Sequence, residues 1–459
     1  MSPSRIPATR ASRARRRLVL IAAVGMAGVV ALSACAPPGP ANPNAGQTPT
    51  VGDVSTELTS EDVTVTIMTN TEASDALTKI SDAFTKQHPN VTFDIVAEAN
   101  SNLAANMSRI LTRNDPPDVI FMPSIGQFVQ DGLIANLDPY FEAYGWDSWS
   151  QELLDINRID TDGQRGSGSL YAVGIGYNVT GIFYNKEIAA EVGMSAPPAT
   201  FAEFDDYAHK AVDAGYLGLS VAAKDAGTPF LLQEVQTAYG DSDAITAWTA
   251  QVPGSSFAQP GMLKAAEKLQ QWKGDGVISK DAVSVDYPTM MGDFQAGKAL
   301  FVPVGDWEAQ RLVAAMGDNV GFFLMPTVEA GAKQYAPAFP SNHAIPAAAK
   351  HKDEAAYFLN WVHTDETARK LIVDVIGSSP GGPTDLPAPQ TDVPLVQETS
   401  EAFQKVLAGG GAVDFFANVS QAFTLSTMNP LMQSLMLGSK TPQQFVDEVQ
   451  AAYESELMK

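Results

Sequence analysis

Apolar and polar residues alternate at the start of the folded part of the chain, and the period of this alternation changes along it. Residues 63–67 alternate between apolar side chains and threonine, which predicts a half-buried strand, and residues 77–84 change to helical spacing. A second strand is expected at 91–95, a helix at 103–111 and a buried strand at 119–122. This β-α-β-α-β order predicts a parallel sheet covered by helices, with a ligand crevice beyond the carboxyl ends of its strands.

A second α/β region is expected to begin near residue 178. Residues 181–184 have the pattern of a strand, and apolar residues at helical spacing mark helices at 201–212 and 262–272. The last helix begins with a capping box, in which Thr441 is the N-cap and Gln444 reaches back to it. Because strands alternate with helices through most of the chain, α/β is the predicted fold class. Further helices are expected at 290–294, 355–362 and 368–375.

Polar residues stand at the carboxyl ends of the three N-terminal strands and are the first candidates for ligand binding. A helix cap or a turn is the alternative role for each of them. That alternative is favoured for Thr71, because it precedes a helix whose first backbone amides need acceptors. The candidates are Asn70, Thr71, Glu72, Glu98, Asn100 and Ser124.

The charge of the chain is strongly negative. The formal net charge is −23, and residues 1–34 hold six arginines and no acid, so the remainder comes to −23 − 6 = −29. An acidic surface of this size repels nucleic acid and anionic lipid head groups, so no nucleic-acid partner is expected. A large charge of one sign can equally reflect solubility alone.

The single cysteine of the chain, Cys35, follows a basic segment at 13–17 and an apolar segment at 18–32. This arrangement is typical of a lipoprotein export signal, in which residues 1–34 are removed and the new N-terminal cysteine is lipidated. A stray buried cysteine after an uncleaved anchor is the alternative. Both the general secretory route and the twin-arginine route stay open.

Residues 35–60 are rich in Pro, Gly, Ala, Ser and Thr and lack apolar periodicity. Such a composition predicts a flexible tether. The folded body would then be held near the extracytoplasmic face of the cell membrane by the lipid on Cys35, rather than by its own acidic surface.

Several segments follow one another in an order that is typical of a known family. The strongest is 170–187, with Tyr-Asn-Lys at 184–186, followed by Pro-Pro-Ala-Thr-Phe at 197–201. Matching pieces also occur at 117–119 and at 294–307. Together they resemble, over residues 61 to 455, the carbohydrate-type extracellular solute-binding proteins of bacterial ABC importers, the group that includes maltose-binding proteins. Phe201 departs conservatively from the tryptophan that is usual in the family.

This resemblance implies a two-lobed periplasmic-binding-protein-like fold, in which each lobe is a mainly parallel sheet flanked by helices and the ligand cleft lies at the hinge. Gly174 and Gly176 are the expected hinge residues, because glycine absorbs changes in backbone angle. A bulge or a tight strand contact is the alternative role for both. The implied lobes are 61–175 with 336–378, and 176–335 with 379–459.

Trp307 is the leading site residue that the resemblance implies. The corresponding aromatic in the family stacks on a sugar ring, whose C–H face packs against an indole, and core packing is the alternative. Phe230 is a possible second platform, and Asp306 and Glu308 would accept hydrogen bonds from sugar hydroxyls. Since aromatic residues are not abundant in the expected cleft segments, a mono- to trisaccharide is expected. The further cleft residues are Tyr177, Asn178, Phe339, Ser341 and Asn342.

The predicted function is that of a monomeric, lipid-anchored substrate-binding component, which closes on a sugar and delivers it to an ABC permease and its ATPase. No catalytic residue, cofactor or metal site is expected. The histidines lack zinc-ligand spacing, and the near-match to a phosphate loop at 292–299 ends in alanine. Two alternatives remain: the same fold binding a polyol phosphate or an ion, and an extracellular carbohydrate-active enzyme with a pair of carboxylates.

Overall fold

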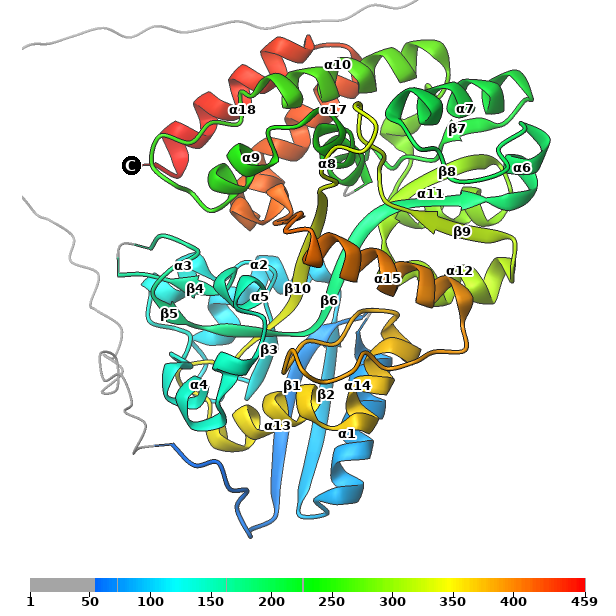
Figure 1. Cartoon of the computed structure of the whole chain (residues 1–459). Helices are drawn as coiled ribbons and strands as arrows, with labels where there is room; N and C mark the ends of the chain where they lie inside the picture. Colours follow the sequence, from blue (N-terminus) through cyan, green and yellow to red (C-terminus); the bar gives the residue numbers. More distant parts are fainter. Residues whose placement is uncertain (1–53, 72, 162, 225–226, 459) are drawn as a thin grey trace, which may run out of the picture. The chain divides into compact units, whose positions relative to one another are not determined.

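The computed structural model describes residues 54–71, 73–161, 163–224 and 227–458, which belong to one compact unit. The predicted signal peptide, Cys35, the tether as far as residue 53 and the site candidate Glu72 lie outside the described residues. Within this unit the elements form a first group and a second group, which two long strands, β6 (Ala172–Asn185) and β10 (Ala336–Ala344), connect (Figure 1).

The first group contains the N-terminal strands and helices together with two helices from later in the chain. The predicted β-α-β-α-β order is confirmed at its start, from β1 to β3. Its elements are β1 (Val63–Asn70), α1 (Ser74–Gln87), β2 (Val91–Glu98), α2 (Asn100–Leu111), β3 (Val119–Phe121), α3 (Gly126–Gln130), α4 (Asp138–Tyr144), α5 (Gln151–Asp155), β4 (Arg158–Ile159), β5 (Ser169–Leu170), α13 (Lys352–Thr364) and α14 (Glu366–Leu371).

The second group contains most of the remaining chain and its C-terminal helix. The predicted capping box is confirmed at the last helix, where the Thr441 side chain accepts from the Gln444 amide and the Gln444 side chain accepts from the Thr441 amide. Its elements are α6 (Lys186–Glu191), α7 (Phe201–Asp213), β7 (Leu217–Leu219), α8 (Gly227–Tyr239), α9 (Ser242–Thr249), α10 (Pro260–Asp275), α11 (Tyr287–Gln295), β8 (Ala299–Gly305), α12 (Ala309–Met316), β9 (Val320–Phe323), α15 (Pro394–Ala408), β11 (Ala412–Val413), α16 (Gln421–Phe423), α17 (Asn429–Leu437) and α18 (Pro442–Glu456).

One mixed sheet of nine strands passes through both groups, in the order β2-β1-β3-β10-β6-β8-β7, with β11 on β10 and β9 on β6. The parallel pairs are β1–β2, β1–β3, β7–β8 and β10–β11. The two connecting strands run antiparallel to each other, and β10 also runs antiparallel to β3 and β6 to β8. The sheet of the first group is therefore largely parallel, as predicted, whereas β6 and β10 add antiparallel pairs, with β10–β11 as the one parallel pair that involves either of them in the described sheet.

Separate apolar cores support the two groups. Phe84 of α1 lies in the core of the first group, where it contacts Phe358 and Trp361 of α13 edge-on. Trp272 of α10 lies in the core of the second group, between Phe201 and Phe204 of α7. Each core holds residues from distant parts of the sequence, so each group depends on long-range packing.

The chain becomes part of the first group before β1 begins. Val54 and Leu58 pack against its core, and Asn90 donates from Nδ2 to the Thr59 carbonyl oxygen at 2.7 Å. Val54, Leu58 and Thr59, at the end of the predicted tether, thus contact the folded body, and the tether boundary at residue 60 stays a prediction.

Gly174 and Gly176 lie on β6 where it passes β10 and the segment after α14. A Cβ on Gly174 would come within 2.5 Å of Pro340 Cβ, and one on Gly176 within 3.1 Å of Ser378 Cβ. The β6–β10 register also shifts between Pro340 and Asn342. These glycines thus permit the close strand contact that was the alternative to a hinge, and their hinge role stays a prediction.

Candidate functional site

Four aromatic side chains lie together where β10, α8 and the end of β8 approach one another. We call Phe230, Trp307, Phe339 and Phe415 the aromatic patch. The ring centroid of Trp307 is 5.5 Å from that of Phe230 and 6.0 Å from that of Phe339. Phe415 stacks on Phe230 at 4.7 Å and on Phe339 at 5.8 Å. Phe230 and Phe415 are buried, whereas Trp307 and Phe339 keep part of their surface in contact with solvent.

Trp307 lies on a 3-10 helix (Asp306–Glu308) between β8 and α12, and polar contacts fix its ring. Its Nε1 donates to the Tyr287 hydroxyl at 2.9 Å, and that hydroxyl donates to Glu308 Oε1 at 3.1 Å. Arg311 also donates to Glu308 Oε1, at 3.2 Å. The polar edge of the indole is therefore satisfied within the protein, which leaves an oriented apolar ring for a ligand.

Gly305 leaves the space that the Trp307 ring occupies. A Cβ at this position would come within 1.9 Å of the indole Cζ3 atom. The backbone at Gly305 is extended, with φ −89° and ψ 169°, so a larger residue would be excluded by the ring and not by the backbone conformation.

Asp306 and Glu308 were predicted to accept sugar hydroxyls, and both side chains are buried. Asp306 is 1% exposed, and its Oδ2 accepts from the Val179 amide of β6 at 3.1 Å. Glu308 is 2% exposed and accepts from Tyr287 and Arg311, as above. In these positions both carboxyl groups brace the 3-10 helix that carries Trp307, and a contact with a ligand hydroxyl stays a prediction.

Burial dominates the electrostatics around the Trp307 turn. Desolvation raises the pKa of the Asp306 carboxyl well above its usual range. Desolvation, followed by the nearby charge of Glu308, raises the pKa of the Tyr287 phenol well above 10. Tyr287 therefore stays protonated at any ordinary pH and keeps its hydrogen bond to Glu308.

The inner side of the aromatic patch is anchored by α8. Gln233, one turn after Phe230, donates from Nε2 to the Asp414 carbonyl oxygen at 2.8 Å and accepts the Phe416 amide at 2.9 Å. These bonds hold the segment that carries Phe415. Phe415 was not among the residues predicted from the sequence, although the adjacent phenylalanines Phe415 and Phe416 were a signal that could have been used.

The candidates on the crossing strands are more buried than the aromatic patch. Tyr177 is 1% exposed, and its ring packs near His363 of α13. Asn178 accepts from the Ser378 hydroxyl at 2.5 Å, and Asn342 accepts from Asn157 Nδ2 at 2.5 Å. Ser341 is half-buried. The two asparagines thus have protein partners in the described structure, and contacts with a ligand stay predictions for all four.

The N-terminal candidates lie at one edge of the sheet, as expected for parallel strands. Asn70 and Glu98 face each other in the register of β1 and β2, at the carboxyl ends of both strands. Asn70 Oδ1 accepts the Ala73 amide at 2.8 Å, so its side chain forms the turn that was the alternative role. Thr71 and Asn100 are exposed, and Ser124 is half-buried before α3. The described structure does not bring these residues into contact with the aromatic patch.

Two surface cavities lie away from the aromatic patch. One of about 560 Å³ is lined by residues of α6 and the following loop, among them Lys186 and Pro197. Another of about 300 Å³ lies beside β1, between Arg113 and Lys350. Neither includes a residue of the aromatic patch. We place the candidate site at the patch, because two partly exposed rings lie side by side there, whereas among the described residues Tyr184 is the single Phe, Tyr or Trp that lines either cavity.

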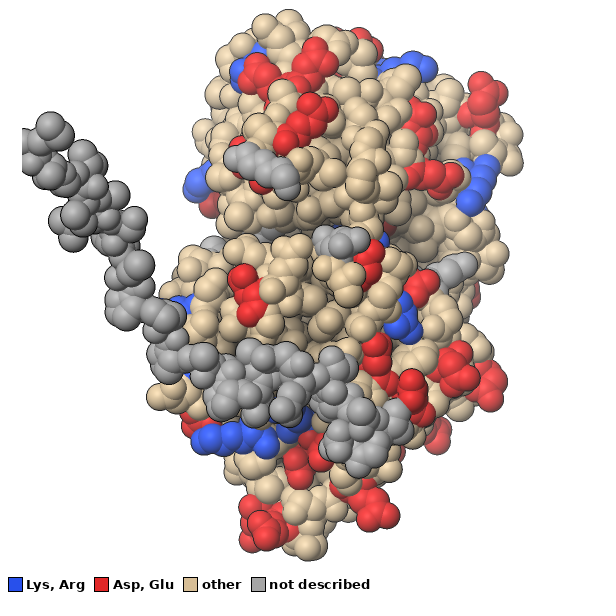
Figure 2. Space-filling view, turned by 90° about the vertical axis from the view of Figure 1, so that its left-hand side faces the viewer, with Lys and Arg blue, Asp and Glu red and all other residues tan. Residues whose placement is uncertain are grey.

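Figure 2 shows acidic side chains spread over the upper and lower parts of one face, with basic side chains among them. Among the residues that the structure describes, no group of three or more His, Cys, Asp or Glu side chains is arranged to hold a metal ion.

The segment after α14 returns along the first group. Thr384 donates from its amide to the Ser148 carbonyl oxygen at 3.0 Å, and Arg369 donates to the Gly381 carbonyl oxygen at 2.5 Å. The sequence analysis assigned residues from 379 onward to the C-terminal lobe, yet these contacts keep the chain beside the first group before α15 begins. The lobe boundaries stay a prediction.

Comparison with known proteins identifies the family. The model of the family described as "Bacterial extracellular solute-binding protein" matches residues 69–369, which is more than half of the chain. The chain belongs to this family. Its match begins at the end of β1 and includes Trp307, Phe339 and both crossing strands.

Curated relatives of this solute-binding protein are distant. A binding protein of Brucella abortus is 21% identical over 224 residues, which are 48% of this chain and 52% of the relative. A binding protein of Brucella suis matches to the same extent. The chain thus spans about half the length of the curated relatives it matches.

Solved structures match nearly the whole folded body. A chitin oligosaccharide binding protein has a TM-score of 0.71 at 17% identity and covers 86% of this chain and 98% of its own. The raffinose complex of RafE has a TM-score of 0.64 at 21% identity, covering 86% and 99%. A maltose-bound protein of T. maritima has a TM-score of 0.69 at 14% identity, covering 86% and 100%. These likenesses show the fold, which is the two-lobed α/β fold of periplasmic binding proteins that the sequence predicts.

Within the part of the chain that the structure describes, no helix has both the length and the apolar character to span a bilayer.

Proposed function

We propose that this solute-binding protein binds a mono- to trisaccharide at the aromatic patch. The observation that carries the proposal is the partly exposed Trp307 ring, which Tyr287 and Gly305 hold in one orientation beside Phe339. A pyranose presents C–H groups on its faces and hydroxyls around its rim, so an oriented aromatic ring with satisfied polar edges suits one face of the sugar. Solved structures with the same fold are named for complexes with raffinose and maltose, which supports this ligand class.

The modest size of the aromatic patch supports a short ligand. Only two of its four rings keep contact with solvent, because Phe230 and Phe415 are buried behind them. Two rings can stack on one or two sugar units, whereas a long oligosaccharide would need platforms along a groove. The remaining affinity would come from hydrogen bonds to hydroxyls, for which Ser341, Asn342 and Asn178 on the crossing strands are the proposed partners.

The protein would work as a carrier that chemically changes nothing. We propose that the lobes close on the sugar and that the closed form delivers it to an ABC permease and its ATPase, with Cys35 as the lipid anchor on the extracytoplasmic side of the membrane. A ligand that binds the closed state more tightly than the open state shifts the population toward closure. We also propose that the protein acts as a monomer.

Calorimetric titration with a panel of mono-, di- and trisaccharides tests the site. Trp307→Ala should weaken binding of the recognised sugar by at least tenfold, because an aromatic contact contributes about 0.5–1.5 kcal/mol beyond the apolar area that it buries. Trp307→Phe should restore part of the lost affinity. The heat of binding and the thermal shift produced by saturating sugar should fall together.

Tyr207→Ala is the matched control, because Tyr207 is a half-buried aromatic residue on α7, remote from the aromatic patch. Its sugar affinity should equal that of the wild type. Equal affinity of wild type and Trp307→Ala would remove the aromatic patch as the site. A thermal shift produced by polyol phosphates or ions, and by no sugar, would show that the ligand is not a sugar.

A further inference from the structure

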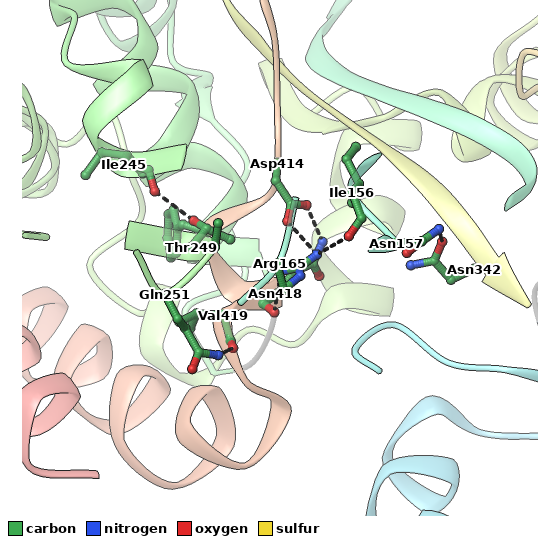
Figure 3. Close-up of polar contacts among 12 residues, drawn as sticks. Ile156, Asn157, Arg165, Ile245, Thr249, Gln251, Asn342, Asp414, Asn418 and Val419 are labelled. Atoms are coloured by element: carbon green, nitrogen blue, oxygen red, sulfur yellow. Dashed lines mark hydrogen bonds and ion pairs between the residues drawn. The ribbon is translucent and has the colours of Figure 1, made fainter. Parts of the chain in front are cut away.

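A buried ion pair joins the first and second groups of elements. Arg165 lies in the hairpin between β4 and β5 of the first group, and its Nη2 is 3.0 Å from Asp414 Oδ2, in the segment after β11 (Figure 3). The side chains are 8% and 9% exposed. An ion pair this deeply buried differs from the surface pairs elsewhere on the protein, most of which are at least half exposed on one side and contribute little.

Further hydrogen bonds fix both members of the pair. Arg165 donates from Nη1 to the Asn418 carbonyl oxygen of the second group and from Nη2 to the Ile156 carbonyl oxygen of the first, each at 3.3 Å. Asn418 Nδ2 donates to the other carboxylate oxygen of Asp414 at 2.8 Å. Both oxygens of Asp414 are thus engaged, and the guanidinium bridges acceptors from both groups, as Figure 3 shows.

The hairpin holds Arg165 toward the second group. Arg165 forms a bridge with Ile159, and the Gly166 amide donates to the Arg158 carbonyl oxygen at 3.0 Å. Gly166 has φ +92°, which allows the chain to turn directly after Arg165. The preceding residue, Gln164, makes a second contact between the groups, from Nε2 to the Ala250 carbonyl oxygen at 2.5 Å.

The acceptor side of the pair is continuous with the aromatic patch. Asp414 directly precedes Phe415, and Gln233 of α8 binds the backbone on both sides of that phenylalanine. A force on the Asp414 carboxylate is therefore transmitted to the segment that carries a ring of the patch. The Arg165–Asp414 pair therefore lies next to the Phe415 segment of the second group, which forms part of the proposed ligand site.

We propose that Arg165 and Asp414 form a clasp that sets the balance between closed and open lobes before any ligand binds. Arg165 acts here as a positioning residue, since it would hold the lobes together without touching the sugar. Opening transfers both charges to water, and removing only one of them leaves the other buried without a partner in the closed form. The effect of the clasp on affinity rests on the proposed function, but its effect on closure does not.

The first test measures lobe separation in the ligand-free full chain. Nitroxide labels are placed at Gln127→Cys in α3 and Asp243→Cys in α9, which are exposed positions in the first and second groups, with Cys35→Ser removing the native thiol. Pulsed electron resonance should give a short-distance population for the unmodified clasp. Asp414→Asn and Arg165→Met should each move at least half of that population to longer distances.

Lys268→Gln is the matched control, because Lys268 pairs with Asp205 at 3.2 Å within the second group and both side chains are largely buried. Its distance distribution should coincide with that of the wild type. Far-UV circular dichroism verifies that each variant is folded. If Asp414→Asn does not fold, Arg165→Met decides the outcome, since it changes only a hairpin side chain. A distribution in Arg165→Met that coincides with the wild type overturns the clasp.

The second test measures sugar affinity in the same variants. If the clasp variants reduce the closed fraction tenfold, the apparent dissociation constant of the sugar should rise about tenfold. Arg165→Met/Asp414→Asn should lose no more affinity than either single variant, because the two side chains act as one unit. Strictly additive losses would overturn the pairing. If the wild type binds no sugar, the proposed function fails, while the distance measurement still decides the clasp.

Discussion

In the proposed sugar site, the orientation of a single indole ring would determine whether the aromatic patch can receive a sugar. The indole nitrogen of Trp307 donates a hydrogen bond to the Tyr287 hydroxyl. Its six-membered ring occupies the space that a side chain at residue 305 would fill. The motif Gly-Asp-Trp was visible in the sequence, and the resemblance to the family selected its tryptophan, but the strand β8 before it was not predicted. The role of glycine within the motif was not predicted either, because only the three-dimensional structure shows the ring folded back over the preceding backbone.

Gly305→Ala should therefore weaken sugar binding although it removes no aromatic atom. The new methyl group would displace the Trp307 ring, and overpacking of this kind costs about 1–3 kcal/mol. We expect a loss of at least fivefold in affinity by calorimetry and a change in the near-ultraviolet dichroism of tryptophan. Gly292→Ala, on the preceding helix with open space at its Cβ position, is the control and should change neither. Unchanged affinity in Gly305→Ala would show that ring orientation does not matter.

The burial of Glu234 makes the stability of the folded protein depend on pH. Its side chain is fully buried on α8 and accepts from the Thr180 hydroxyl at 2.5 Å, and desolvation raises its pKa to about 7. The folded state therefore holds the proton more tightly than the unfolded chain, where the group titrates near 4.5. The stability that this group contributes is fully present below pH 4.5 and is lost as the pH rises toward 7.

Glu234→Gln should remove the loss of stability that Glu234 causes as the pH rises. In urea unfolding, the free energy of unfolding of the variant relative to wild type should rise by about 3 kcal/mol between pH 4.5 and 7.5. Burial lowers the pKa of His343 to about 4 and of His363 to about 3, so these histidines favour the folded state increasingly as the pH rises from 3 toward 6.5. Their contribution is common to both proteins and cancels in the difference. A difference that stays constant with pH would contradict the assignment to Glu234.

At the scale of elements, α8 links functions that the sequence analysis treated separately. Gln233 and Glu234 follow Phe230 by three and four residues, a spacing that places each of them on the same side of the helix as Phe230. The first contributes to the aromatic patch, the second holds the Asp414 segment, and the third reaches β6. Residues 228–238 of α8 are all buried, so no polar face in the sequence indicates which neighbours each side of the helix contacts. The clasp and Phe415 were missed for this reason.

The capping box of α18 was fully predictable, since all of its contacts lie within four residues. Thr441→Ala should lower the free energy of unfolding by about 1 kcal/mol, because the Gln444 amide loses its acceptor. Thr441→Ser keeps the oxygen and should lose less than half of that amount. Urea unfolding compares the two variants. Equal losses would mean that the methyl group of Thr441, and not its hydrogen bond, stabilises the helix.

At the scale of the whole molecule, local patterns predicted the α/β class, and the resemblance to a family predicted the two-lobed fold. The pairing of β10 with both β3 and β6 was not predicted, because its partners are more than 150 residues away in the sequence. Arg165 and Asp414 are also far apart in the sequence, at 414 − 165 = 249 positions. The Trp307 motif could be found by resemblance, whereas its neighbours Phe339 and Phe415 became a patch only when the fold brought distant segments together.

The insertion of β10 between β3 and β6 has a consequence for synthesis. Ribosomes deliver the chain from its N-terminus, yet the first group lacks its fourth strand until residue 344 has been made and α13 until residue 364. Its apolar helices and strands must wait, incompletely covered, while some 180 intervening residues are produced. For a chain predicted to be exported, this delay lengthens the time during which it stays free of stable structure and available to secretion factors or chaperones. The strand order that connects the lobes therefore also delays the folding of the first group.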